Sequence, residues 1–148
     1  MGLDLSWFQE GLKFKCTGCG KCCTGSPGYV YLSHSDIQTL AEHLSLSTEE
    51  FTKNYTRWVE DGYALLDSPG SSDCIFLKDQ KCTAYTARPT QCRTFPWWPQ
   101  NLRSPEDWQK AAVHCEGISH TEAPLVSSIQ IQSECLTYLD NLLERNFR

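Results

Sequence analysis

The sequence has no long apolar run and no excess of basic residues. No stretch among its 148 residues approaches the roughly 20 apolar positions that a helix needs to cross a bilayer. The formal charge is −5 and the pI is about 5.3, and no Lys/Arg-rich run offers an electrostatic footprint for a nucleic-acid backbone. We therefore expect neither a membrane nor a nucleic acid among the partners of this protein.

The first residues also lack the charged segment and following apolar run of an export signal. The chain nevertheless contains nine cysteines. In a cytoplasmic protein the thiols are kept reduced, so this density favours metal ligation over a disulfide framework. An odd total also argues against complete pairing. We expect a cytoplasmic protein, and a secreted disulfide-bonded domain is the least favoured alternative.

The length predicts a single domain over residues 1–148, with a modest core that cross-links would help to stabilise. The part from residue 74 to residue 115 is rich in turn signals and leaves little room for long regular structure. Its prolines are Pro89, Pro96, Pro99 and Pro105. We predict a small metal-stabilised α+β domain: an irregular cysteine-rich core with short strands, several short helices and a long C-terminal amphipathic helix.

Three helix starts can be predicted from capping residues. Ser33 or Ser35 precedes an apolar series at helical spacing, and Ser47 begins a sequence of the capping-box form. Ser104 is followed by proline and two acidic residues, and we predict a helix from there to about Val113. Short strands are predicted at 29–32 and 63–66, and residues 3–12 favour a short helix or an irregular arm.

A long amphipathic helix is predicted for residues 124–147. We expect Leu125, Ile129, Leu136, Leu139 and Leu143 on one face, with Ile131, Cys135, Tyr138 and Leu142 beside them. The thiol of Cys135 then lies among apolar side chains, where a cysteine behaves as a small buried apolar residue. We expect this helix to pack on the cysteine-rich part of the chain, residues 14–118.

The densest group of cysteines is the stretch Cys16-Thr17-Gly18-Cys19-Gly20-Lys21-Cys22-Cys23. Its first three cysteines form two overlapping C-x2-C pairs, and a tight turn between two such thiols lets both reach one ion. Glycine inside these turns tolerates a positive φ. Side chains of adjacent residues usually diverge, so the sulfurs of Cys22 and Cys23 are expected to serve different places, at two ions or at two vertices of a cluster.

Four further cysteines follow, at positions 74, 82, 92 and 115, and complete two sets of four. Tetrahedral zinc and a cubane iron–sulfur cluster each take four thiolates, so the number alone does not choose between them. The stretch begins as a bacterial ferredoxin does, but its fourth cysteine comes too early, and the second C-x2-C of a zinc ribbon is absent. The dispersed ligands favour zinc, with an iron–sulfur cluster as the alternative.

Other residues near the cysteines have two interpretations. The cations Lys15, Lys21, Lys81, Arg88 and Arg93 either balance thiolate charge or are ordinary solvated side chains. His114, beside Cys115, is an alternative ligand or proton carrier, although a surface or packing role is favoured. In Pro96-Trp97-Trp98-Pro99 the two indoles cannot both face one core, so one is a candidate contact for a protein partner and packing is the competing interpretation.

Several strings occur together in the order of one known family. They are Phe14 to Cys23, Cys74-Ile75-Phe76-Leu77, Cys82-Thr83-Ala84-Tyr85, Arg88-Pro89-Thr90-Gln91-Cys92-Arg93-Thr94-Phe95-Pro96 and Cys115-Glu116-Gly117-Ile118. In the identity and order of these strings, the chain resembles the YkgJ-type CxxCxxCC cysteine-cluster family, a zinc- or iron-chelating domain. The resemblance implies metal chelation by Cys16, Cys19, Cys22, Cys23, Cys74, Cys82, Cys92 and Cys115.

Two classes of function follow from the sequence. The favoured one is a metal-binding module in which zinc or iron folds the irregular part of the chain. The alternative is a redox protein or enzyme that uses a [4Fe–4S] cluster or a reactive thiol. No catalytic residue is assigned, and no glycine-rich loop after a strand suggests a methyl-donor pocket, so a catalytic role is less favoured.

Overall fold

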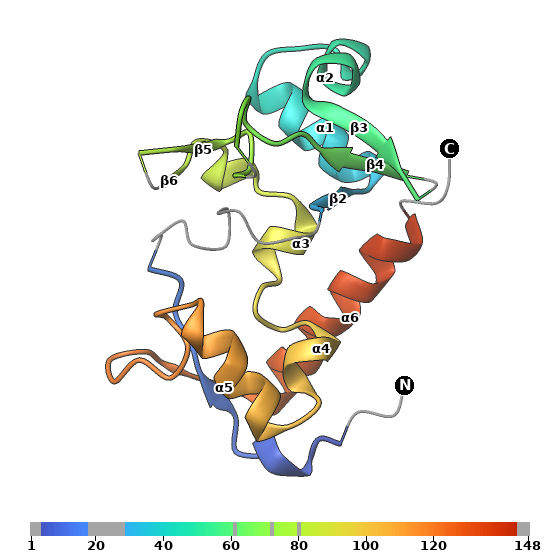
Figure 1. Ribbon diagram of the computed structural model, residues 1–148. Helices are drawn as coiled ribbons and strands as arrows, with labels where there is room; N and C mark the ends of the chain where they lie inside the picture. The colour runs from blue at the N-terminus through green and yellow to red at the C-terminus, as the bar shows by residue number, and fades with distance from the viewer. Residues whose placement is uncertain (1–3, 18–28, 61, 72, 80, 145–148) are drawn as a thin grey trace.

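The computed structural model describes residues 4–17, 29–60, 62–71, 73–79 and 81–144. Figure 1 shows two groups of elements, one above the other, with α3 between them and the long helix α6 running from the lower group to the upper one. Short antiparallel strands and helices make up both groups, which confirms the predicted α+β class. No helix of the described residues is long and apolar enough to cross a membrane.

The upper group is built on a three-stranded antiparallel sheet in the order β2-β4-β3. Its strands are β2 (Tyr31–Leu32), β3 (Thr56–Val59) and β4 (Gly62–Leu65). Helices α1 (His34–His43) and α2 (Thr48–Tyr55) connect β2 to β3. Both begin where the sequence predicts: Ser33 caps α1 in a capping box with Asp36, and Ser47 accepts from Glu50 N–H at the start of α2.

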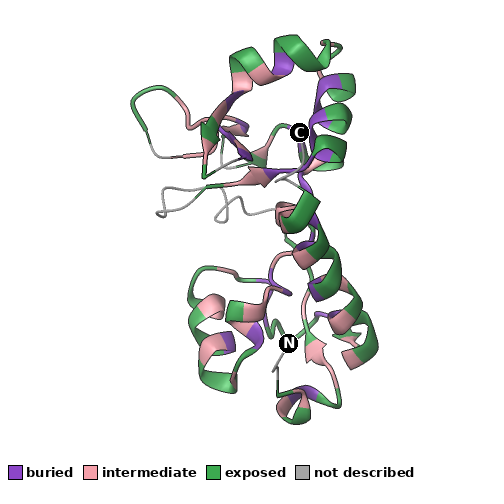
Figure 2. Ribbon diagram, turned by 90° about the vertical axis from the view of Figure 1, so that its right-hand side faces the viewer, coloured by how far each residue is buried: buried purple, intermediate pink, exposed green. Residues whose placement is uncertain are grey.

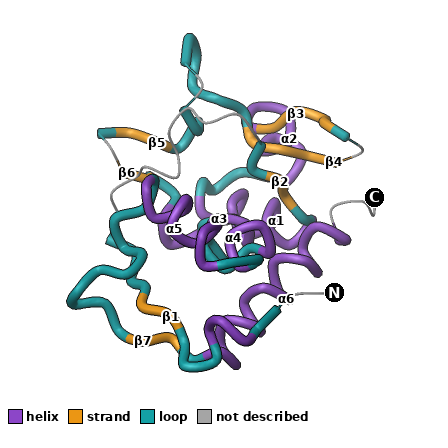
Figure 3. The backbone as a smooth tube through the Cα atoms, turned by 60° about the horizontal axis from the view of Figure 1, so that its bottom comes forward, coloured by secondary structure: helices purple, strands orange, loops and turns teal. Residues whose placement is uncertain are grey.

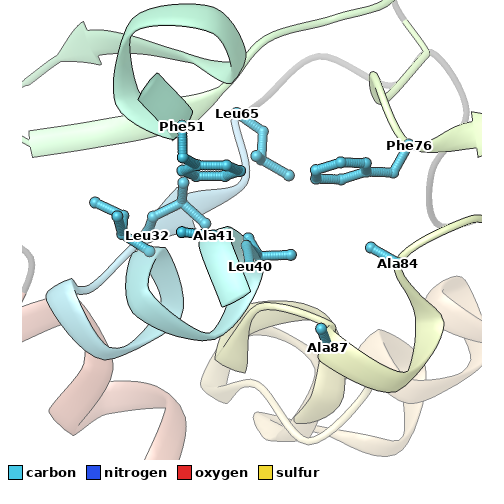
Figure 4. Packing of buried hydrophobic residues seen from close by; sticks show 9 residues of the cluster. Leu32, Leu40, Ala41, Phe51, Leu65, Phe76, Ala84 and Ala87 are labelled. Atoms are coloured by element: carbon cyan, nitrogen blue, oxygen red, sulfur yellow. The ribbon is translucent and has the colours of Figure 1, made fainter. Parts of the chain in front are cut away.

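A hairpin and two short helical turns complete the upper group. The hairpin pairs β5 (Leu77–Lys78) with β6 (Lys81–Cys82), and the turns are η3 (Tyr85–Ala87) and α3 (Thr90–Arg93). Figure 4 shows how side chains from these elements meet α1 and α2 in the upper core. The buried residues of this core are Leu32, Ile37, Leu40, Ala41, Phe51, Leu65, Phe76, Ala84 and Ala87.

The lower group has its own core. Its elements are η1 (Ser6–Phe8), β1 (Leu12–Lys13), α4 (Pro99–Leu102), α5 (Pro105–Val113) and β7 (Leu125–Val126). Strands β1 and β7 form an antiparallel pair that Figure 3 places far from the β2-β4-β3 sheet. The buried residues of the lower core are Phe8, Trp97, Leu102, Trp108, Ile118, Ile131 and Cys135.

Helix α6 (Ser128–Glu144) is present as predicted but differs in two respects. It begins at Ser128 because the preceding residues Leu125 and Val126 pair with β1 as β7. Its buried residues are Ile131, Cys135, Tyr138 and Asn141. The prediction that Ile129, Leu136 and Leu143 face the core is wrong, because these residues are 80%, 53% and 65% exposed.

Buried and exposed stretches alternate along the helices of both groups in Figure 2, as expected for helices that cover a core with one side. Helix α6 contacts α3 and β2 of the upper group, and its residues Ile131 and Cys135 are buried in the lower core, so it packs against both groups. Helices α3 and α6 therefore connect the two groups.

Candidate metal centre

Five of the eight predicted ligands lie in the described part of the chain. Cys16 follows β1, Cys74 precedes β5, Cys82 ends β6, Cys92 is in α3 and Cys115 follows α5. Cys19, Cys22 and Cys23 lie outside the described residues. Cys16 is exposed and the other four are partly buried.

Cys16 and Cys115 are in segments that run side by side. The backbone N–H of Lys15 donates to the carbonyl of Gly117 (3.2 Å), and Phe14 forms a bridge with Ile118. Thr17, the residue after Cys16, donates from its Oγ1 to Glu116 Oε1 (2.6 Å) across 99 positions of sequence. These contacts bring the first cysteine of the chain next to the last of the eight predicted ligands.

Gly117 makes this approach possible. A Cβ at this position would lie 2.1 Å from the carbonyl oxygen of Lys15 and 3.0 Å from its carbonyl carbon, which is too close for any side chain. Glycine permits such close contact of two backbones because it has no Cβ. The glycine two residues after Cys115 is therefore required for the packing of the segment that carries Cys16.

Cys74 and Cys82 are brought together by the β5–β6 hairpin. Cys82 pairs with Leu77 in the ladder, and the N–H of Leu77 donates to the carbonyl of Cys74 (2.9 Å). Both cysteines pack against the upper core. The hairpin thus offers two thiols from one compact unit, while Cys115 packs against the lower core.

Cys92 is positioned by a buried carboxylate. Asp36 Oδ1 accepts from both the backbone N–H (2.9 Å) and the hydroxyl (2.8 Å) of Thr90, and its Oδ2 accepts from the N–H of Ser33 (3.2 Å). The same side chain that closes the capping box of α1 therefore also holds the first residue of α3. Cys92, two residues later, is fixed relative to the upper core.

The neighbour of Cys92 contacts the chain that follows the cysteine-rich stretch. The side-chain oxygen of Gln91 accepts from the N–H of Tyr31 (3.1 Å), and its nitrogen donates to the carbonyl of Tyr29 (3.0 Å). Residue 29 is the first one described after residue 17. Both ends of the undescribed stretch are thus attached to cysteine-bearing segments, at Cys115 and at Cys92.

The N-terminal segment extends from the lower group toward the upper one. In Figures 1 and 3 the described end of the N-terminal segment runs from the lower group toward the β5–β6 hairpin. Among the residues that the structure describes, no three His, Cys, Asp or Glu side chains are grouped closely enough to hold an ion. The described chain therefore brings ligand segments together in pairs, and a complete ligand set would have to draw on Cys19, Cys22 and Cys23 as well.

Comparison with known proteins identifies the family of this chain. A family model described as "Putative zinc- or iron-chelating domain" matches residues 15–116, which is more than half of the chain. The chain belongs to the CxxCxxCC family. The uncharacterized protein MJ0661 of Methanocaldococcus jannaschii is 30% identical over 92 residues, a match covering 61% of this chain and 48% of the relative. The chain thus spans about half the length of that curated relative. No solved structure matches this chain.

The arginines of this CxxCxxCC domain make local contacts. The guanidinium of Arg88 lies 3.9 Å from the ring centroid of Tyr85, and Arg93 donates to Thr90 Oγ1 (3.0 Å). Lys15 and Lys81 are exposed, and Lys21 lies outside the described residues. His114 is exposed at the end of α5. Arg88 and Arg93 therefore stabilise η3 and α3, next to Cys92.

Of the two adjacent tryptophans of the domain, Trp97 is buried and Trp98 is half-buried, and both pack against other aromatic rings. Trp97 is 5% exposed, stacks on Trp108 with ring centroids 5.2 Å apart, and contacts Phe14 edge-on. Trp98 stacks on Tyr138 (5.3 Å), and its indole N–H donates to the carbonyl of Gln91 (3.1 Å). These contacts agree with the interpretation that the two tryptophans serve packing. A protein partner at Trp97 and Trp98 stays a prediction.

Cys135 differs from the eight predicted ligands. It is fully buried in the lower core beside Ile131, which confirms its interpretation as a small apolar residue. Burial raises the pKa of the Cys135 thiol because the charged thiolate would be desolvated. A thiol with a raised pKa is a poor nucleophile and a poor metal ligand.

Sequence analysis missed the residues that hold these segments together. Gln91 and Thr90 lie inside the string that carries the family resemblance, and Gly117 lies in the string after Cys115, yet none has a side chain that binds metal. Their position inside these strings is the one signal that could have identified them. Thr90 and Gln91 act through partners that are 54 to 62 positions away in the sequence.

Proposed function

We propose that this CxxCxxCC domain binds zinc or iron through cysteine thiolates, and that the bound ion links the upper and lower groups of elements. The observation that supports this most is the pairing of residues 13–17 with residues 116–119, which brings the segments of Cys16 and Cys115 together across most of the sequence. The proposed ligands are Cys16, Cys19, Cys22, Cys23, Cys74, Cys82, Cys92 and Cys115.

The chemistry of these ligands supports a role for the ion in folding. Cys74 and Cys82 pack against the upper core and Cys115 against the lower one, so an ion shared between them would join two hydrophobic cores. Ligand thiols must lose their protons to bind, and a site assembled from distant segments does not exist in the unfolded chain. Metal binding would therefore stabilise the folded state, and it requires reduced cysteines, as in the cytoplasm.

Zinc is the ion we propose first, because the ligands are dispersed over separate elements and the spacing departs from that of ferredoxins. Iron, alone or as a [4Fe–4S] cluster, is the alternative. The two are distinguished by colour, since a cluster absorbs visible light and zinc, a d10 ion, does not.

The test is metal analysis of protein purified without oxygen, together with its visible spectrum. We expect tightly bound zinc, or iron with acid-labile sulfide, in the wild type. Cys115→Ser should lose a large part of this metal, whereas Cys135→Ser should keep it because Cys135 is buried in the lower core. A wild-type protein without metal, whose reduced thiols also fail to take up added zinc or iron, would refute the proposal.

A further inference from the structure

The side chain of Gln91 makes an unusual contact for a residue in a helical turn. Its amide oxygen accepts from the N–H of Tyr31 (3.1 Å) and its amide nitrogen donates to the carbonyl of Tyr29 (3.0 Å). A neighbouring β-strand would satisfy the backbone of residues 29 and 31 in the same two-point way. Gln91 thus takes the place of a strand at the edge of β2 that is not paired with β4.

The rest of Gln91 is held firmly. Its own carbonyl accepts from the indole N–H of Trp98 (3.1 Å) and from Thr94 Oγ1 (3.3 Å). Thr90, just before it, is held by the buried carboxylate of Asp36. A side-chain amide that projects from a backbone fixed in this way can position the segment that it binds.

The two segments that Gln91 connects both lead to predicted ligands. Cys92 is the next residue in α3, and Cys23 precedes Tyr29 by only six positions in the sequence. Six residues span at most about 20 Å when fully extended, so fixing Tyr29 next to α3 limits how far Cys23 can lie from Cys92. A contact that restricts two ligand segments in this way lowers the entropy lost when they bind one ion.

We propose that Gln91 is a positioning residue of the metal centre, which holds the segment after the cysteine-rich stretch against the helical turn of Cys92. This inference rests on the proposed function and adds a residue that does not itself bind the ion. Residues that orient metal ligands typically change metal affinity ten- to hundredfold when they are replaced. The same range is expected here.

The test compares Gln91→Met and Gln91→Ala with the wild type by Co²⁺ titration under reducing conditions, followed by competition with Zn²⁺. Methionine keeps the length of the side chain and removes both hydrogen bonds, so it separates the amide contact from packing. Asn101→Ala is the matched control, because Asn101 also donates a side-chain amide hydrogen bond to a backbone carbonyl, that of Pro96 (3.0 Å), but in α4. Thermal unfolding of each metal-free variant measures the loss of stability separately.

We expect both Gln91 variants to bind Co²⁺ about ten- to hundredfold more weakly, with a weaker thiolate-to-cobalt absorption band at saturation, while Asn101→Ala keeps wild-type affinity. Equal affinity of Gln91→Met and the wild type would overturn the inference and leave the proposed function intact. An affinity loss in Asn101→Ala as large as that in Gln91→Met, at a similar loss of stability, would overturn it as well. A wild type that contains no metal and binds none of Co²⁺, Zn²⁺ and iron would refute the proposed function, and with it this role of Gln91.

Discussion

Replacing Gly117 by alanine should separate the segments of Cys16 and Cys115. The added Cβ would lie 2.1 Å from the carbonyl oxygen of Lys15, whereas real Cβ atoms essentially never approach closer than 3.0 Å. The Lys15 carbonyl must therefore retreat by at least 0.9 Å, the difference between these two distances. Its neighbours leave little freedom, because Phe14 Cε1 also lies 3.3 Å from the added atom.

The cost of this retreat can be estimated from the contacts it disturbs. The hydrogen bond from Lys15 N–H to Gly117 O, now 3.2 Å, would lengthen to about 4 Å if the segments part by the same amount, beyond hydrogen-bonding range. Overpacking typically costs about 1–3 kcal/mol and a lost hydrogen bond about 1 kcal/mol. We expect Gly117→Ala to lower the free energy of unfolding by about 2–4 kcal/mol and to weaken metal binding tenfold or more.

Gly11→Ala is the matched control for this variant. Its Cβ would also strike a backbone carbonyl, 2.3 Å from that of Val126, but at the start of β1 and away from Cys115. Urea unfolding and metal titration of both variants give the comparison. Gly11→Ala should lose stability with a smaller loss of metal affinity. Equal metal affinities for the wild type and Gly117→Ala would refute the role that we assign to this close approach.

Three further predictions concern the two hydrophobic cores beside the candidate metal centre. Thr90→Val removes a hydroxyl that donates to the buried carboxylate of Asp36, and urea unfolding should show a loss of about 1–3 kcal/mol. Trp97→Ala should cost about 3–5 kcal/mol in the same assay because it opens a cavity beside Trp108, whereas Trp58→Ala, at a 43% exposed position, should cost less; equal losses would contradict the packing described for Trp97. Cys135 should react with iodoacetamide only after unfolding, and labelling of Cys135 in the native protein, located by peptide mass spectrometry, would contradict this. Because the pKa of Cys135 is raised in the folded state, the free energy of unfolding should also fall as pH rises past the ordinary thiol pKa.

Local sequence signals predicted the helices well. Ser33, Ser47 and Ser104 each cap a helix at the predicted place, because a capping side chain acts on backbone groups only two or three residues away. The α5 helix also ends at Val113 as predicted. Elements defined by such short-range contacts can be found from the sequence alone.

Strands and the buried face of α6 were harder to predict. Strands β1 and β7 are two residues long and exist because they pair with each other across more than 100 positions, which no local pattern reveals. Strand β3 was also missed, although its partner β4 follows it directly in the sequence as the second strand of a hairpin. On α6, leucine and isoleucine occur on more than one side, so the choice of the buried side depended on where α3 and β2 lie.

The candidate site was predictable as a set of residues but not as an arrangement. The cysteine spacing identifies possible ligands, because two thiols separated by a tight turn can reach one ion. It does not show that Cys16 runs beside Cys115, which depends on the missing side chain of Gly117. Nor does it show that Cys92 is linked to the chain around Tyr29 through Gln91. Such contacts are fixed by tertiary structure.

The most direct test of metal binding by cysteine thiolates is X-ray absorption at the K-edge of the metal that the purified protein contains. The extended fine structure reports the atoms that surround the ion and their distances. We predict a shell of sulfur at about 2.3 Å, the usual distance from zinc to thiolate, and a loss of sulfur neighbours in Cys115→Ser. A first shell of only nitrogen or oxygen at about 2.0–2.2 Å would contradict metal binding by the cysteines.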